Sequence, residues 1–385
     1  MNFLLLAILI STAVYPQSDS RFQKVIGGPG IDRGVFVTPT TDGGYISVGA
    51  TQSYGRGEDD VYLVKTDSRG RLKWSRSYGG PAEDNGWSVR ETADGFILAG
   101  FTKSFGAGGF DFFLIKTDFQ GEITWTNTFG GKGDERAWAL IPAAGGGFVL
   151  VGETTGNDPG GDRDCLLVKT DSTGREEWSR TYGGPKGDRC FSIAQANDNG
   201  FVLAGQTYSE GAGDRDVFII KTDPSGEKQW SRTFGGAASD VGHWITKLSN
   251  GGYLVTGYST SLAKDLDDPY LIKIDEQGNT LWTRVLPMKG VNHTITGTQA
   301  VDGGFFLTGF SVYAEKRTNA ALLIKTDVNG NLEWYEDILP TSAGRSLGYT
   351  VSATSDGGCV FTGHSTINSA GNLDLLLVKV RNKND

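Results

Sequence analysis

Histidine, methionine and cysteine are scarce in this 385-residue sequence, with three, two and three copies. The histidines stand at positions 243, 293 and 364, so no His-x-x-x-His pair is present to bind a metal. No cysteine stands directly beside a histidine, the arrangement that would suggest an activated thiol nucleophile. The sequence therefore predicts no catalytic residues, and the protein is expected not to be an enzyme.

An excess of basic charge is also lacking. Asp and Glu total 45 against 36 Lys and Arg, which gives a formal net charge of −9. Nucleic acids and anionic membrane surfaces bind basic faces, so we expect neither as a partner. The apolar segment Phe3–Val14 is too short to span a bilayer and is followed by polar residues. It predicts a signal peptide over residues 1–20 and a secreted, extracellular protein without a membrane span.

Glycine is abundant instead, with 57 residues, about twice the roughly 7% that is usual. Much of it belongs to a repeat marked by a lysine, usually in Ile/Val-Lys-Thr-Asp, that recurs every 51 to 54 residues. A tryptophan follows each of the first six lysines by nine residues. The lysines are Lys65, Lys116, Lys169, Lys221, Lys273, Lys325 and Lys379, and the tryptophans are Trp74, Trp125, Trp178, Trp230, Trp282 and Trp334.

Each repeat predicts four short strands joined by glycine turns. In the second copy these are Trp87–Thr92, Phe96–Thr102, Asp111–Thr117 and Glu122–Thr128. Two hairpins in each copy make one four-stranded antiparallel blade. The sequence thus predicts an all-β, seven-bladed β-propeller that forms one domain over residues 21–385. The repeats span about 30–79, 81–130, 132–183, 185–235, 237–286, 288–339 and 341–380, the last completed by 21–28.

The two ends of the chain predict how the ring closes. The seventh copy stops where its fourth strand should begin, whereas Phe22–Ile26 and the following Gly-Gly match Trp74–Tyr78 and its Gly-Gly. We therefore expect the N-terminal strand to complete the last blade in a 1+3 closure.

The repeat, written Asp-Gly-Gly-Phe…Ile-Lys-Thr-Asp-x-x-Gly-x3-Trp, resembles the β-propeller repeats of secreted bacterial and archaeal proteins, the SBBP-like repeats. The resemblance covers residues 21–380. It implies an extracellular setting and a binding role, and it brings no catalytic residues.

Two sets of residues are candidates for ligand binding at the mouth of the central channel. The first is a ring of acids after each Gly-Gly, for which the alternative role is to cap backbone amides of their own loops: Asp32, Asp84, Glu135, Asp188 and Asp240. The second opens the first strand of each repeat, and its alternative role is packing between blades: Trp87, Trp138, Phe191, His243 and Tyr349, with Val35 and Ile295 at the same place. Aromatic rings near carboxylates suit sugars or cationic groups.

A second acidic series stands five residues before six of the seven lysines: Asp60, Asp111, Asp164, Asp216, Asp268 and Asp374. Calcium is a possible cofactor here, although an Asp that holds its own turn is the commoner use, and no other cofactor is expected. Cys165, Cys190 and Cys359 occupy packing positions, so we expect free buried thiols and no disulfide. Asn292 begins a glycosylation sequon, which matters only if the source glycosylates its secreted proteins.

Loop lengths favour binding over catalysis. The connection between the second and third strands has the same length in every copy except one, in which the segment from Thr154 to Asp164 is one residue longer. Enzymes usually build their sites from long, dissimilar loops. We therefore expect a monomeric, secreted binding module for an extracellular glycan, peptide or protein. A quinone-dependent dehydrogenase, whose propellers resemble the Asp-x-x-Gly-x3-Trp pattern, and a structural envelope or matrix protein are the alternatives.

Overall fold

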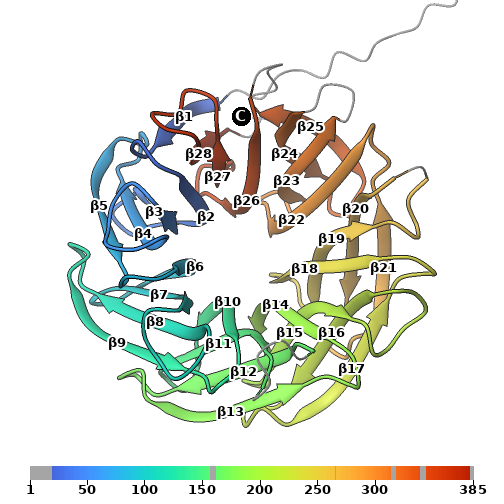
Figure 1. The fold of residues 1–385 in the computed structure, drawn as a ribbon. Helices are drawn as coiled ribbons and strands as arrows, with labels where there is room; N and C mark the ends of the chain where they lie inside the picture. The colour runs from blue at the N-terminus through green and yellow to red at the C-terminus, as the bar shows by residue number, and fades with distance from the viewer. Residues whose placement is uncertain (1–19, 157–161, 265, 314–317, 339–343, 382–385) are drawn as a thin grey trace, which may run out of the picture.

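Alternating buried strands and glycine turns produce a ring of blades. The computed structural model describes residues 20–156, 162–264, 266–313, 318–338 and 344–381. In these ranges the strands form seven four-stranded antiparallel sheets around a central axis (Figure 1). Sequential strands pair in every sheet except the last, whose order is β1-β28-β27-β26. The structure is the seven-bladed β-propeller that the repeat predicts.

The strands of the first four blades are as follows. Blade 1 has β2 (Asp32–Pro39), β3 (Tyr45–Thr51), β4 (Asp60–Thr66) and β5 (Leu72–Tyr78). Blade 2 has β6 (Asp84–Thr92), β7 (Gly95–Thr102), β8 (Asp111–Thr117) and β9 (Ile123–Phe129). Blade 3 has β10 (Glu135–Pro142), β11 (Phe148–Thr154), β12 (Asp164–Thr170) and β13 (Glu176–Tyr182). Blade 4 has β14 (Asp188–Gln195), β15 (Phe201–Thr207), β16 (Asp216–Thr222) and β17 (Lys228–Phe234).

The remaining three blades repeat this order from the axis outward. Blade 5 has β18 (Asp240–Lys247), β19 (Tyr253–Ser259), β20 (Asp268–Ile274) and β21 (Thr280–Val285). Blade 6 has β22 (Val291–Gln299), β23 (Phe305–Tyr313), β24 (Thr318–Thr326) and β25 (Leu332–Ile338). Blade 7 has β26 (Ser346–Ala353), β27 (Cys359–Ser365), β28 (Asp374–Val380) and β1 (Ser20–Ile26).

Closure of the ring is the predicted one. Strand β1 pairs antiparallel with β28, from Ser20 opposite Val380 to Ile26 opposite Leu375. In Figure 1 the blue β1 lies beside the red β28 at the junction of the two chain ends. The described residues contain no helix long and apolar enough to cross a membrane. The predicted signal segment Phe3–Val14 lies outside the described residues.

Aromatic side chains of the outermost strands fasten each blade to the next. Trp74 packs against Gly121, in the turn between the third and fourth strands of blade 2, and its ring centroid lies 6.0 Å from that of Phe96. The glycine is needed because a Cβ there would meet the indole ring. At the closing junction Phe22 of β1 takes the place of the tryptophan and covers Gly70 of blade 1.

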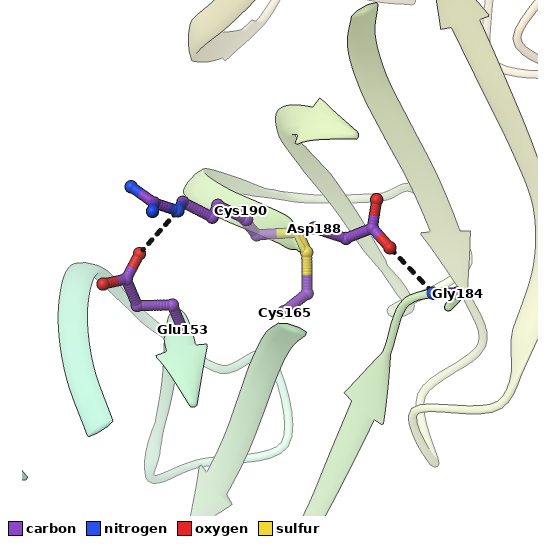
Figure 2. Close-up of a disulfide and its surroundings, with 6 residues drawn as sticks. Glu153, Cys165, Gly184, Asp188 and Cys190 are labelled. Carbon is purple, nitrogen blue, oxygen red and sulfur yellow. Dashed lines mark hydrogen bonds and ion pairs between the residues drawn. A yellow bond between two sulfur atoms is a disulfide. The ribbon is translucent and has the colours of Figure 1, made fainter. Parts of the chain in front are cut away.

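The cysteines correct one prediction. Cys165 on β12 and Cys190 on β14 form a disulfide that joins blade 3 to blade 4, whereas both were expected to be free thiols (Figure 2). Both are fully buried in the core that the two blades share. The odd cysteine count hid the pair, because the two residues are 25 positions apart and only the ring brings their Cα atoms to 5.0 Å. Cys359 is free and buried, as expected.

Candidate functional site

The innermost strand of every blade carries a β-bulge at the predicted aromatic position. In blade 2 Gly86 pairs with Gly100 and Ser88 with Ala99, so that Trp87 is the extra, unpaired residue. A bulge re-aims the side chain of its extra residue. The seven bulged residues, which we call the collar, are Val35, Trp87, Trp138, Phe191, His243, Ile295 and Tyr349.

Each bulge depends on a glycine in the neighbouring second strand. A Cβ added to Gly100 would collide with the backbone carbonyl oxygen of Asn85 on β6. The same collision recurs in all seven blades, at Gly49, Gly100, Gly152, Gly205, Gly257, Gly309 and Gly363. Sequence analysis missed the bulges, although this glycine in the middle of an otherwise apolar strand was their signal. Pairing continues on the N-terminal side of the bulge, with Asp84 opposite Thr102, so β6 begins three residues before the predicted Trp87.

The collar encloses one cavity on the propeller axis, which we call the cup. It has a volume of about 280 Å³, and all seven collar residues line it. Trp87 and Trp138 meet edge to face with ring centroids 4.5 Å apart, and Trp87 also reaches Tyr349, at 6.3 Å. Phe191 and His243 lie 5.5 Å apart on the opposite arc. Five of the seven collar residues, from Tyr349 through Trp87, Trp138 and Phe191 to His243, thus form a continuous run of rings in the cavity wall, and the aliphatic Val35 and Ile295 complete it.

The floor of the cup consists of residues that follow the collar. Phe36 of blade 1 and Trp244 of blade 5, which are not neighbours in the ring, approach to 5.8 Å between ring centroids. The Arg90 guanidinium carbon lies over the Phe36 ring, 4.3 Å from its centroid, well within the roughly 6 Å of a cation–π contact. Burial lowers the pKa of Arg90 to about 10, so it stays charged at neutral pH. These contacts cross the axis beneath the cup.

Most of the cup wall is uncharged at neutral pH. Burial lowers the pKa of His243 to about 3, so its imidazole is neutral, and burial raises the pKa of the Tyr349 hydroxyl. The indole N–H groups of Trp87 and Trp138 are buried and find no acceptor in the described part of the chain. Arg189 is the charged residue among those that line the cup. The cup therefore offers apolar faces and one cation.

The predicted ring of acids is buried and is not exposed at the surface of the protein. Asp32, Asp84, Glu135, Asp188 and Asp240 are at most 2% exposed. Each accepts a hydrogen bond of 2.7–2.8 Å from the backbone N–H four residues earlier, as Asp188 does from Gly184 in Figure 2. The interpretation of these acids as caps of their own loops is confirmed. Their role in ligand binding stays a prediction.

The second acidic series also holds loops. Asp60, Asp111, Asp216 and Asp374 accept hydrogen bonds from backbone amides of the preceding loop. Asp164 differs: burial, with Asp188 and Asp162 nearby, raises its pKa to about 6. No group of three or more His, Cys, Asp or Glu residues in the described ranges is placed to hold a metal ion. Calcium therefore stays a prediction.

Two further sequence features lie in buried positions. The side chain of Asn292 is 1% exposed and its amide donates to the carbonyls of Lys289 and Gly290, so a glycan there would require this loop to open. Residues 344–348 have the Gly-x-Ser-x-Gly spacing of a nucleophile elbow, which sequence analysis overlooked. Ser346, however, is fully buried in β26 and donates to the carbonyl of Ile338. It is a structural hydroxyl.

Beside the cup, between blades 3 and 4, lies a second cavity that is rich in arginine. It has a volume of about 570 Å³, and its charged lining residues are Arg163, Lys186 and Arg189 together with Asp134 and Asp162. Beneath it Glu153 is fully buried and accepts a 2.6 Å ion pair from Arg163. Sequence reasoning missed this cluster, since Glu153 stands where the other blades have Ala, Phe, Gln, Tyr or His. Arg189 lines both cavities and connects them.

Comparison with known proteins supports the fold and leaves the family open. No protein-family model matches the chain. A segment of 143 residues is 29% identical to the regulatory protein FlaEY of Caulobacter vibrioides, which covers 31% of this chain and 15% of that protein. The Pan2 WD40 domain of Neurospora crassa superposes with a TM-score of 0.55 at 13% identity, over 95% of this chain and 97% of that domain.

Two further solved structures share the architecture. The polysaccharide lyase Uly1 superposes with a TM-score of 0.54 at 11% identity, over 91% of this chain and 90% of the other. The β-propeller domain of the trilobed protease from Pyrococcus furiosus, described as having an open velcro topology, gives 0.50 at 10% identity, over 92% and 94%. Here β1 closes the ring instead. At such identities the likeness establishes a β-propeller and nothing finer.

Proposed function

We propose that this protein is a secreted, non-catalytic binding module that holds an extracellular glycan in the cup. The observation that carries the proposal is a cavity on the axis, with Phe36 and Trp244 in contact at its base, whose wall includes five aromatic residues at bulges. Aromatic faces of the collar can pack against the apolar faces of sugar rings.

Secretion is supported by two independent features. The buried disulfide between Cys165 and Cys190 fits an oxidising compartment, because structural disulfides are rare where thiols are kept reduced. The apolar segment Phe3–Val14 has the length of a signal peptide core. The resemblance of the repeat to the SBBP-like propellers of secreted proteins agrees with both.

The test is a titration of the purified protein with a panel of oligosaccharides, followed by calorimetry and tryptophan fluorescence. Trp87→Ile and Trp138→Ile copy Ile295, the residue that blade 6 places at the same bulge, so each keeps the fold while removing an aromatic face. We expect each substitution to weaken binding about 10-fold or more. Trp178→Phe on the outer strand β13 is the matched control and should bind normally.

Three outcomes would overturn the proposal. The first is unchanged affinity in the double variant Trp87→Ile/Trp138→Ile. The second is a panel in which no glycan binds while a peptide or surface protein does. The third is shortening of the bound oligosaccharide during incubation, which would make the protein an enzyme.

A further inference from the structure

We propose that the glycan carries carboxylate groups, and that Arg189 selects a uronate residue by pairing with its carboxylate at the edge of the cup. This inference rests on the proposed function and deepens it. It starts from the charges beside the cup, which the collar alone does not explain.

Three guanidinium groups surround one buried carboxylate. Arg163 forms a 2.6 Å ion pair with Glu153, whereas Arg136 and Arg189 approach it only to 3.7 and 3.5 Å. Arg136 also pairs with Asp134 at 3.4 Å and lies over the rings of Phe110 and Phe101, 4.1 and 5.7 Å from their centroids. The carboxylates around this cavity are Glu153, Asp134 and Asp162, against the cations Arg136, Arg163, Arg189 and Lys186, so four positive and three negative charges leave a formal charge of +1 in a protein that is acidic as a whole.

Among the described contacts of Arg189, the ion pair to Glu153 is made through Nε and is long. Its two Nη groups are therefore available for a bidentate partner, the arrangement in which arginine binds carboxylates best. The side chain is 37% exposed, enough to be reached, and it lines the cup as well as the arginine-rich cavity. A ligand in the cup thus meets aromatic rings and a guanidinium together.

The backbone of Arg189 is held in place before any ligand arrives. The next residue, Cys190, is tied by its disulfide to Cys165 on β12 of the preceding blade (Figure 2). Asp188, the residue before, caps the loop that leads into β14. Preorganisation of this kind lowers the entropic cost of binding.

A hexuronate fits these features in one unit. Its ring has an apolar face for the collar, and its carboxylate projects from the ring edge for Arg189. Lys186 and Arg163, further out in the adjoining cavity, would face the charge of the next acidic residue in the chain. The oligosaccharide would then extend from the cup across the junction of blades 3 and 4.

The probes are oligogalacturonate, alginate and hyaluronan oligosaccharides, with methyl-esterified oligogalacturonate as the matched neutral form. We expect at least one uronate probe to bind, with an affinity that falls as salt rises. Arg189→Asn copies Asn85, the residue at this place in blade 2, and should weaken binding about 10- to 100-fold. Arg180→Asn on the outer strand β13 is the control and should leave affinity unchanged.

Each result decides between the two proposals. Equal binding of the methyl ester and the free acid, lost in Trp87→Ile but not in Arg189→Asn, would overturn the carboxylate inference and leave the glycan module standing. Binding of a sulfated neutral oligosaccharide in place of every uronate would also overturn it. Absence of binding to any glycan, charged or neutral, would remove both proposals.

Discussion

Removal of the disulfide between blades 3 and 4 should destabilise the propeller by a predictable amount. Cys165→Val and Cys190→Ala are the right changes, because Val61 and Ala137 fill the same positions in blades 1 and 3. The double variant thus removes the covalent link with little change in packing. The linked residues are 25 positions apart, and closing a loop of that size in the unfolded chain is worth about 3.5 kcal/mol.

The melting temperature should fall accordingly. Unfolding entropy of about 2.1 cal/mol/K per residue gives about 0.8 kcal/mol/K for this chain, so the loss corresponds to roughly 4–5 °C. Differential scanning calorimetry with and without reductant is the assay: reductant should lower the wild-type transition to that of the variant and leave the variant unchanged. Alkylation of the denatured, unreduced protein should modify Cys359 alone. Three alkylated thiols, or a melt indifferent to reductant, would refute the reasoning.

Two further predictions concern the ring and its titration. Phe22→Ala should lower the free energy of unfolding by about 2 kcal/mol. This is less than the roughly 3–5 kcal/mol of a fully buried phenylalanine, because Phe22 is half-buried where it closes the ring. Denaturant titration checks the value, and the control substitution Gln23→Ala, at the exposed neighbouring position, should cost almost nothing. Burial lowers the pKa of His364 to about 4, below the 6.5 of the unfolded state, so the unfolded chain takes up the proton first as pH falls from 6.5 to 4. The free energy of unfolding should drop by up to about 1.4 kcal/mol per pH unit over that window. His364→Phe should remove this part of the pH dependence. Equal pH dependence of stability in the wild type and the variant would contradict the assignment to His364.

The predictable part of this protein follows from its repeat. Strand length, the apolar second and third strands and the glycine turns recur so regularly that each copy specifies the same local structure. Seven blades of equal size then form a closed ring. The match between Phe22–Ile26 and Trp74–Tyr78 identified the N-terminal strand as the one that completes the last blade. The loop-capping acids could be interpreted in the same way, because each forms its hydrogen bond only four residues away.

What the repeat could not determine is how different blades meet across the ring. The bond between Cys165 and Cys190, the contact of Phe36 with Trp244 across the axis and the approach of Arg189 to Glu153 all involve positions where one blade departs from the others. A periodic pattern fixes what the copies share, through local hydrogen bonds and burial. The cup and its arginine depend on the residues in which the blades differ. These residues form a site only when the closed ring brings seven unlike side chains to one axis.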